Sequence, residues 1–367
     1  MKIIQLITAL GNGGAEKFVV ELSNELSKSN DVIVCTYRDN EDWMIPPTKL
    51  TPAVKLHSLS VKGSRNIKNI VKAFKFIKSE NPDIVHVHSS LIIYYLFFFV
   101  LIFKKTKFCY TIHSHSEFSS LKSLFNFLNK IHFLVKRWTF IALSKSIKDD
   151  FEKKYSKLCF DYVENGIAPL ELSGNQLDLD IEYKPNNQKG SMVFLAIGNY
   201  TFAKRFDFLA EIFKELSDSF NVSLLIIGKD VSKDKLVEKK IILLNASNVK
   251  MLGIKTNIAD YISVSDAFVC SSSIEGLPLV ILEALSLGKP IITTPAGAIG
   301  EVVINNENGF ITKDFSKEAF IEKIECFIQS SDEFKIKIGE NNIKKFNANF
   351  TISICAQKYL NIYSFFS

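Results

Sequence analysis

Short apolar runs alternate with helix-like patterns along the first half of the chain. The runs at 2–8, 31–37, 83–88, 107–112 and 139–143 have the length and β-branched content of buried strands. Between them, apolar residues recur at helical spacing over 14–28, 66–79, 91–103 and 121–137. Strands that alternate with helices in this way predict a parallel sheet with helices on both faces.

The alternation stops at residues 168–190, where Pro169, Gly174, Pro185 and Gly190 predict a linker. It resumes with strand-like runs at 192–197, 222–227, 248–252, 267–271, 290–294 and 309–312. We therefore predict an α/β protein with two Rossmann-like doubly wound domains, 1–167 and 191–340. A C-terminal helical segment at 341–367 follows, with packing back on the N-terminal domain as one option. Such sheets bind ligands beyond the carboxyl ends of their strands, so two in tandem would face a shared cleft.

Composition narrows the class of protein. With 47% hydrophobic and 23% charged residues, the chain has the make-up of a soluble globular protein. Its longest apolar run, 91–103, is shorter than the roughly 18 residues that a spanning helix needs, which favours a buried core helix. Six cysteines without CxxC spacing argue against a zinc site or a disulfide framework and favour a reducing, cytoplasmic setting.

Charge is distributed unevenly between the two halves. Residues 1–167 hold 24 Lys and Arg against 15 Asp and Glu, whereas residues 168–367 hold 21 against 24. The basic half has two readings: lysines on solvated helix faces, or attraction to anionic lipid or a polyanionic acceptor. Nothing in the sequence suggests a nucleic-acid partner.

The most informative motif is the run from Glu275 to Glu283, which follows the strand at 267–271. A turn through Gly276 into a helix with Pro278 near its start would aim free backbone N–H groups at one spot, which attracts phosphate. Two carboxylates eight positions apart would lie on about the same side of that helix. Because carboxylates repel phosphate and bind hydroxyl groups, the motif suits a diphosphate flanked by hydroxyl-rich rings, as in a nucleotide sugar.

A second loop supplies positive charge. Gly198, Asn199, Lys204 and Arg205 follow the first strand of the second domain. A Lys or Arg here could reach a diphosphate held by the helix after Glu275 and offset its charge. The alternative is a basic pair on the surface.

Glycines also follow the first strand of the chain, where Gly11, Gly13 and Gly14 precede Glu16. The dinucleotide fingerprint needs a Gly or Ala where Glu16 stands, so the pattern argues against NAD. Close backbone approach at this turn suits an acceptor or a phosphate, and the alternative is an ordinary tight turn.

Histidines end two neighbouring strands of the first domain. His113, with His115 two residues on, ends the strand at 107–112, and His86 and His88 end the strand at 83–88. No Cys or carboxylate accompanies them at metal-ligand spacing, so we predict no metal. We expect His113 to bind a sugar hydroxyl or to lie at the reacting centre, and His86 and His88 to be satisfied polar groups within the loops.

Residues 118–138 have an amphipathic pattern. On a helix, Leu121, Leu124, Phe125, Leu128 and Trp138 fall on one face, with Lys122, Lys130, Lys136 and Arg137 on another arc. Peripheral contact with an anionic membrane and ordinary packing against the sheet both fit this pattern.

These motifs together resemble the retaining family 4 glycosyltransferases of the two-domain GT-B fold, of the type that builds bacterial surface polysaccharides. The resemblance lies in 265–284, 288–294 and Gly300–Glu301, and, less specifically, in 13–16, 82–88, 111–113, 142–144 and 163–167. It covers nearly the whole chain.

The resemblance implies a role for each matching position. Glu283 would bind the donor ribose, Glu275 the donor sugar, and Gly276 with the amides of Leu277, Leu279 and Val280 the phosphates. Lys204 would neutralise the leaving diphosphate, and His113 would lie near the transferred sugar. Gly13, Gly14 and Glu16 would form an acceptor loop. Asn199 departs from the family, which usually has Arg there, and Arg205 is a candidate to compensate.

The predicted activity is transfer of a sugar from a nucleotide-sugar co-substrate, with retention and without a metal or other cofactor, to a glycan or lipid-linked glycan. The reaction would take place in the cytoplasm or at the inner face of the cytoplasmic membrane. Two alternatives stay open. A nucleotide-sugar epimerase or hydrolase would form product from the donor alone, and a non-catalytic glycan or lipid-carrier binding subunit would bind ligand without Lys204 and His113. The donor base, the sugar, the acceptor and the linkage are left open.

Overall fold

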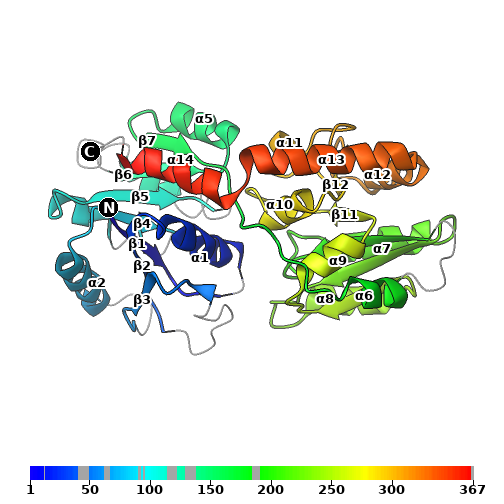
Figure 1. Cartoon of the computed structure of the whole chain (residues 1–367), viewed down its shortest axis with the longest axis horizontal. Helices are drawn as coiled ribbons and strands as arrows, with labels where there is room; N and C mark the ends of the chain where they lie inside the picture. The colour runs from blue at the N-terminus through cyan, green and yellow to red at the C-terminus, as the bar shows by residue number, and fades with distance from the viewer. Residues whose placement is uncertain are drawn as a thin grey trace. The chain divides into compact units, whose positions relative to one another are not determined.

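The computed structural model describes residues 1–11, 13–39, 49–61, 67–89, 92–93, 96–113, 122–128, 138–183 and 191–364. The chain forms two compact units, each described below by itself. Unit 1 comprises Met1–Ala168 with Phe350–Ser367, and unit 2 comprises Pro169–Asn349 (Figure 1).

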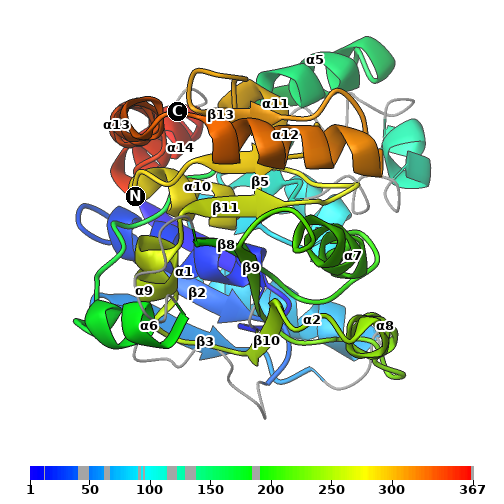
Figure 2. The same cartoon turned by 90° about the vertical axis from the view of Figure 1, so that its right-hand side faces the viewer.

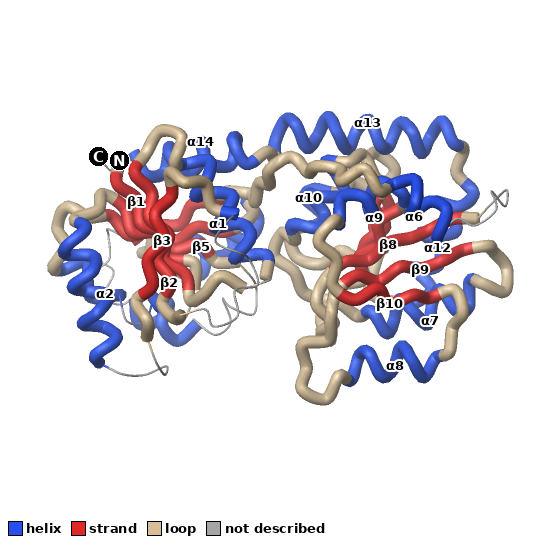
Figure 3. Tube along the Cα trace, turned by 60° about the horizontal axis from the view of Figure 1, so that its bottom comes forward, coloured by secondary structure: helices blue, strands red, loops and turns tan. Residues whose placement is uncertain are grey.

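Unit 1 is built on a parallel sheet of seven described strands in the order β3-β2-β1-β4-β5-β6-β7, all labelled in Figure 1 and drawn in red in Figure 3. The strands are β1 (Lys2–Ile7), β2 (Asp31–Thr36), β3 (Val54–Ser58), β4 (Ile84–Val87), β5 (Lys107–Thr111), β6 (Trp138–Ala142) and β7 (Cys159–Tyr162). Helices α1 (Gly14–Leu26), α2 (Ile67–Glu80) and α5 (Lys145–Lys154) and the 3₁₀ helix η2 (Phe97–Leu101) connect them. The central strands are buried along their whole length, as expected when helices cover both faces.

The C-terminal helix α14 (Ile352–Ser364) belongs to unit 1 and packs against α1. Ile167 and Thr351 form a parallel bridge, and Ile352 N donates to the carbonyl oxygen of Ile167 at 2.8 Å. A side chain at Gly166 would collide with the carbonyl of Thr351 and with Cys355. Helix α14 therefore packs closely against the end of the segment Met1–Ala168, and it brings Tyr359 and Tyr363 into the buried part of unit 1.

Unit 2 is a second parallel sheet, in the order β10-β9-β8-β11-β12-β13. Its strands are β8 (Met192–Ile197), β9 (Val222–Ile227), β10 (Val249–Gly253), β11 (Ala267–Cys270), β12 (Ile291–Thr293) and β13 (Gly309–Ile311). Its helices are α6 (Gln176–Tyr183), α7 (Phe206–Leu216), α8 (Leu236–Leu244), α9 (Ile258–Val264), α10 (Leu279–Ser286), α11 (Ile299–Val302), α12 (Lys317–Gln329) and α13 (Asp332–Asn349). The prediction of two parallel-sheet α/β domains is confirmed.

Part of the predicted linker folds onto unit 2. Helix α6 lies in 168–190 and packs beside α9 (Figure 2). Asp260 of α9 is fully buried and accepts hydrogen bonds from Ser173 N and Oγ, from Gln176 Nε2 and from Asn257 Nδ2. These bonds hold the pKa of Asp260 below its usual value although burial opposes them. The described part of the segment, up to residue 183, is thus an anchored part of unit 2.

The second boundary also differs from the prediction. Helix α13 runs without a break through 340–341 and ends at Asn349, so the division falls between Asn349 and Phe350. The apolar periodicity of the sequence continues past residue 340, so it does not mark the division. The division lies where the chain leaves α13 and begins to pack in unit 1.

Two predicted helices of unit 1 are described only in part. In 91–103 the described residues Ile92, Ile93 and Leu96 are helical, the 3₁₀ helix η2 follows, and Ile92, Ile93, Leu96 and Val100 pack in the core. In the predicted helix 121–137, residues 122–128 are helical; Leu124, Phe125 and Leu128 are buried in the same core, and Trp138 is the first residue of β6. The apolar face of the amphipathic pattern is therefore core packing at these residues, while 118–121 and 129–137 lie outside the described residues. No helix in the described parts of the chain is long and apolar enough to cross a membrane.

Candidate functional site

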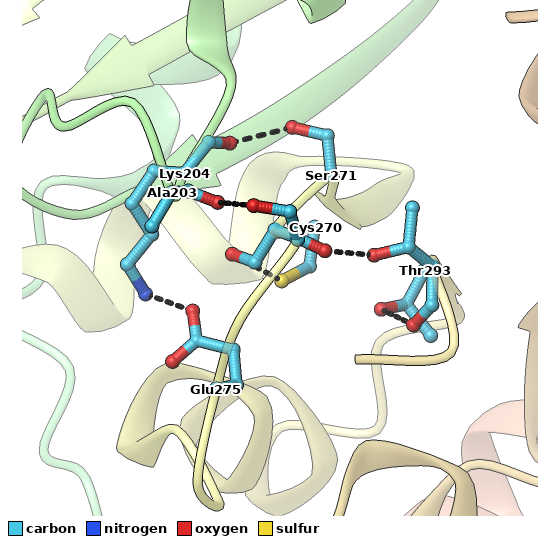
Figure 4. Close-up of polar contacts among 9 residues, drawn as sticks. Ala203, Lys204, Cys270, Ser271, Glu275 and Thr293 are labelled. Atoms are coloured by element: carbon cyan, nitrogen blue, oxygen red, sulfur yellow. Dashed lines mark hydrogen bonds and ion pairs between the residues drawn. The ribbon is translucent and has the colours of Figure 1, made fainter. Parts of the chain in front are cut away.

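Three loops meet at the carboxyl ends of β8, β11 and β12 in unit 2. Ser271 Oγ donates to the carbonyl oxygen of Lys204 at 2.7 Å, and Ser273 N donates to that of Ala203 at 2.8 Å (Figure 4). Thr294 N donates to the carbonyl oxygen of Cys270 at 3.1 Å. Short polar residues at the strand ends therefore fasten the loop after β8 to the loop after β11, and fasten that loop to β12.

Lys204 and Glu275 form an ion pair in this cluster. Lys204 Nζ lies 2.5 Å from Glu275 Oε1, and both side chains are largely buried (Figure 4). Burial by itself would lower the pKa of Lys204. The charge of Glu275 outweighs burial and raises this pKa above its ordinary value, and Cys270 and the hydrogen bond to Glu275 contribute in the same direction. Lys204 is therefore a fixed positive charge at neutral pH.

The helix after this loop starts close to residue 278, as the sequence predicted. Pro278 is the N-cap of α10, so Glu275 lies in the loop before the helix and only Glu283 lies on it. The prediction that both carboxylates share one helix is wrong, because the extended backbone of Pro278 (ψ 133°) separates them. Glu275 instead points to the loop after β8, where it meets Lys204.

The first turn of α10 presents backbone donors. The N–H groups of Leu279 and Val280 precede the first possible intrahelical acceptors, whereas Ile281 N bonds the carbonyl oxygen of Pro278 at 3.1 Å. Glu283 follows in the second turn, with a side chain only 2% exposed. Helix α13 packs on α10, and Asn342 Nδ2 donates to the carbonyl oxygen of Lys289 at 2.8 Å. This hydrogen bond supports α10 from the chain just beyond its C-terminal end.

Gly297 holds the Glu275 loop at close range. Its φ is +57°, in the left-handed region, and a Cβ there would collide with the carbonyl oxygen of Glu275. Ala298 N also donates to the carbonyl oxygen of Gly276 at 3.0 Å. The sequence has a turn with two glycines after β12, at 295–300, but only the structure shows that Gly297 fixes the backbone of Glu275.

Asn199 and Arg205 flank Lys204 in different ways. Asn199 lies half-buried between Gly198 and Tyr200, at the start of the loop after β8. Arg205 caps α7, stacks its guanidinium 3.7 Å from the ring centre of Phe208, and donates to the carbonyl oxygen of Phe315 at 3.1 Å. The structure thus gives Arg205 a local packing role, and its part in donor binding stays a prediction.

The glycine turn of unit 1 opens α1. Gly13 is the N-cap, Gly14 is the first helical residue, and Glu16 in the first turn folds its carboxylate back over Gly13. Burial raises the pKa of Glu16, although its own backbone N–H works against the shift. A carboxylate at a helix N-terminus is stabilised by the helix dipole. The role of these residues as an acceptor loop stays a prediction.

Histidines of β4 and β5 form a buried polar cluster in unit 1. His88 Nδ1 lies 3.0 Å from His113 Nε2, and His88 Nε2 lies 2.7 Å from Gln5 Oε1. His86 contacts the Tyr363 hydroxyl through Nδ1 at 2.6 Å and Thr111 Oγ1 through Nε2 at 2.8 Å. His115 lies outside the described residues.

These rings are neutral. Burial lowers the pKa of His113 to about 4, and burial with the nearby histidines holds the pKa of His86 and His88 well below the usual value. Within the described residues, no group of three or more His, Cys, Asp or Glu side chains is arranged to hold a metal ion.

The structure thus brings Lys204, Glu275 and the first turn of α10 together in unit 2, and His113 with His86 and His88 in unit 1. Sequence reasoning missed Gln5, Tyr359 and Tyr363. Gln5 could have been noticed, because it is the one polar residue inside the apolar run Ile3–Ile7. The tyrosines could not, because they lie between 248 and 358 residues from their partners.

Comparison with known proteins gives the family. Residues 12–169 match the model for glycosyltransferase family 4, and residues 180–345 match the model for glycosyl transferases group 1. Together the two matched ranges cover most of the chain.

Curated relatives agree with these matches. The chain is 27% identical to an uncharacterized glycosyltransferase, MJ1178, of Methanocaldococcus jannaschii, over 61% of this chain and 65% of the relative, so the match spans less than two thirds of that relative. It is 25% identical to the amylovoran biosynthesis glycosyltransferase AmsD of Erwinia amylovora, over 90% of each chain. It is also 24% identical to the Escherichia coli UDP-Gal:alpha-D-GlcNAc-diphosphoundecaprenol alpha-1,3-galactosyltransferase, over 76% of this chain and 74% of the relative.

Solved structures share the fold over nearly the full length. Sucrose-phosphate synthase of Thermosynechococcus elongatus has a TM-score of 0.80 at 17% identity, covering 100% of this chain and 99% of the other. HepE of Anabaena, solved with UDP and glucose, has a TM-score of 0.79 at 18% identity and covers 99% of each chain. The fold is therefore GT-B, and the chain belongs to the glycosyltransferases that join a family 4 domain to a group 1 domain.

Proposed function

We propose that this glycosyltransferase is a retaining, metal-independent enzyme of cell-surface polysaccharide assembly. It would move a sugar from a nucleotide-sugar donor to a glycan or a lipid-linked glycan. The observation that carries this proposal is the Lys204–Glu275 pair beside the N-terminus of α10. A fixed cation next to the backbone N–H groups at a helix N-terminus suits a diphosphate, and a neighbouring carboxylate suits sugar hydroxyls.

The donor assignment follows from charge. A nucleoside diphosphate would place its phosphates at the amides of Leu277, Leu279 and Val280, with Lys204 as counter-charge. The deeply buried Glu283 is the candidate acceptor for ribose hydroxyls, as the resemblance of 265–284 to the retaining family implies. A solved structural neighbour, HepE, was crystallised with UDP and glucose, which supports a nucleotide-sugar donor for this chain as well.

The proposed reaction balances without an added metal. The bond between sugar C1 and the β-phosphate oxygen breaks, and the acceptor hydroxyl oxygen bonds to C1 on the same face. The hydroxyl proton passes to the departing phosphate oxygen. Negative charge builds on that phosphate while the sugar becomes cationic, so Lys204 and the N-terminus of α10 stabilise the leaving group. Because the pKa of Lys204 is raised, the lysine keeps its proton through this step. Retention is inferred from the resemblance of 265–284 to the retaining family.

The acceptor is inferred from relatives. AmsD takes its name from amylovoran biosynthesis, and the name of the Escherichia coli relative specifies a sugar on diphosphoundecaprenol. A lipid-linked acceptor would place the reaction at the inner face of the cytoplasmic membrane. Flotation with anionic liposomes tests this location, and protein that stays at the bottom of the gradient would count against it.

A donor screen tests the proposed function. Nucleotide sugars are first ranked by thermal shift, since a ligand bound only by the folded state raises the melting temperature. The best donor is then incubated with and without lipid-linked or free glycan acceptors, and the product is analysed by NMR for its anomeric configuration. Product that requires acceptor, retains configuration and survives EDTA supports the proposal.

The same assay separates the alternatives. Hydrolysed or epimerised sugar from donor alone, at the rate seen with acceptor, would indicate a hydrolase or an epimerase. Donor or glycan binding with no turnover under any condition would indicate a binding subunit. Loss of transfer on adding EDTA, restored by a divalent cation, would contradict the metal-independent mechanism.

A further inference from the structure

A row of hydrogen bonds crosses three neighbouring strands of unit 1 and ends at His113. It starts at Gln5 in the middle of β1, passes through His88 just after β4, and reaches His113 just after β5. Since β4 lies between β1 and β5 in the sheet, the fold itself sets this order. Gln5 and His88 are both buried, so solvent does not compete for their polar atoms.

The direction of the row follows from the Gln5 amide. Its Nε2 faces the Tyr363 hydroxyl at 3.5 Å, and its Oε1 faces His88 Nε2 at 2.7 Å. A carbonyl oxygen only accepts, so His88 Nε2 carries the proton of that neutral ring. His88 Nδ1 is then an acceptor, and His113 Nε2 donates to it at 3.0 Å. In a neutral ring this leaves His113 Nδ1 unprotonated.

A second branch gives Gln5 its orientation. Tyr363 of α14 accepts from Gln5 Nε2 and donates its own proton to His86 Nδ1 at 2.6 Å. His86 Nε2 then donates to Thr111 Oγ1 at 2.8 Å. Hydrogen-bond donation therefore runs towards the Gln5 oxygen in the first branch and away from the Gln5 nitrogen in the second, and a flipped amide would reverse both. Helix α14, far away in the sequence, completes the arrangement.

We propose that Gln5 and His88 are positioning residues that hold His113 with Nε2 protonated and Nδ1 as a hydrogen-bond acceptor for a sugar hydroxyl. The hydroxyl belongs to the donor sugar or to the acceptor glycan, and the inference rests on the proposed function for that substrate. A neutral acceptor nitrogen orients a hydroxyl without adding positive charge beside a sugar that becomes cationic. The reversed row would make His113 Nδ1 a donor instead.

The tautomer is measured without any substrate. Full-length protein labelled with ¹⁵N-histidine is examined by long-range ¹H–¹⁵N NMR at pH 7, and His113 is assigned through His113→Asn. We expect the Nε2-protonated form for His113. In Gln5→Met, which keeps the length of the side chain but removes its polar atoms, we expect a mixture of both tautomers.

Tyr359→Phe is the matched control. It removes a buried hydroxyl that contacts Thr111 Oγ1 at 3.0 Å but leaves every bond of the Gln5–His88–His113 row. We expect the His113 tautomer to stay unchanged in this variant. An Nδ1-protonated His113 in the unsubstituted protein would overturn the proposal, and that result needs no variant to fold.

Kinetics then links the tautomer to catalysis. Gln5→Met should lower kcat/KM about tenfold, whereas Tyr359→Phe should stay within about twofold of the unsubstituted enzyme. If the tautomer is as proposed but Gln5→Met retains full kcat/KM, the positioning role is refuted while the proposed function stands. If the unsubstituted protein transfers no sugar, the proposed function fails and the NMR result still reports on the row.

Discussion

The polar clusters of the two units lie at equivalent places but differ in charge. In each unit, the side chains gather where parallel strands end. Unit 2 places a charged pair, Lys204 and Glu275, in loops tied by hydroxyl groups. Unit 1 places neutral imidazoles, His86, His88 and His113, in a chain of hydrogen bonds. The sheet edge thus supplies a location, and the residues at that edge make the cluster charged in unit 2 and neutral in unit 1.

The largest effect is expected from removing the charge in unit 2. Lys204→Ala should lower kcat about 10²- to 10³-fold, because it removes the cation that offsets charge on the leaving phosphate. Lys240→Ala is the control, since it breaks an ion pair of similar length, 2.8 Å to Asp207, on the surface of the same unit. Steady-state kinetics of both variants checks this. Turnover of Lys204→Ala within about threefold of the unsubstituted enzyme would exclude the assigned role.

A smaller effect is expected from displacing Glu275 while keeping its charge. Gly297→Ala puts a Cβ against the carbonyl of Glu275 at a left-handed φ, so the backbone of the loop must move. We expect kcat/KM to fall about tenfold and stability to fall by about 1–3 kcal/mol. Gly300→Ala is the control, because its Cβ would meet only Ile311 Cδ1 at an ordinary 3.6 Å. Steady-state kinetics and urea unfolding compare the two variants. Equal kcat/KM and equal stability of Gly297→Ala and Gly300→Ala would show that Gly297 does not position Glu275.

The smallest effect is expected in the pH dependence of the free energy of unfolding, to which the two clusters should contribute in opposite directions. The histidines of unit 1 have folded pKa values below the unfolded value of about 6.5, so the unfolded chain binds more protons below that pH. Their stabilisation is complete above about pH 6.5 and declines towards pH 4. The raised pKa of Lys204 acts the other way, and its contribution is lost as pH rises above about 10.5.

Urea unfolding at pH 7, 6 and 5 measures the contribution of the histidines to stability, because few carboxylates titrate in this pH range. We expect the free energy of unfolding to fall steadily across it. A constant value from pH 7 to pH 5 would mean that the histidines of unit 1 are not held neutral.

The parts that sequence predicted well are those decided by local pattern. All six strands of unit 2 lie within about two residues of their predicted ends, because each is a compact apolar run. The missed strands are β3, an edge strand with alternating exposure, and β7, a four-residue strand with two polar positions. Helix α6 lies in a segment rich in turn residues, which concealed it, and its anchor, Asp260, is 84 residues from Gln176 in the sequence.

The site shows the same limit. The Lys204 loop, the Glu275 run and His113 could be named because each follows a strand, and strand ends meet at one edge of a sheet. The contacts that give them their properties are long-range: Gly297 against Glu275, and Tyr363 of α14 against Gln5 and His86. One local prediction also failed: a helix that begins after the N-cap Pro278 leaves Glu275 in the preceding loop, so the two carboxylates do not share it.

We propose that the cluster of unit 2 binds the phosphates and that the cluster of unit 1 orients a hydroxyl. The binding of a nucleoside diphosphate alone tests this assignment most directly. UDP, GDP and ADP are titrated calorimetrically into the unsubstituted protein, and the tightest is repeated with Lys204→Ala and Gln5→Met. We predict that Lys204→Ala weakens this binding at least tenfold, whereas Gln5→Met leaves the dissociation constant within about twofold. Unchanged affinity in Lys204→Ala, or equal weakening in both variants, would contradict the assignment of phosphate charge to unit 2 and hydroxyl orientation to unit 1.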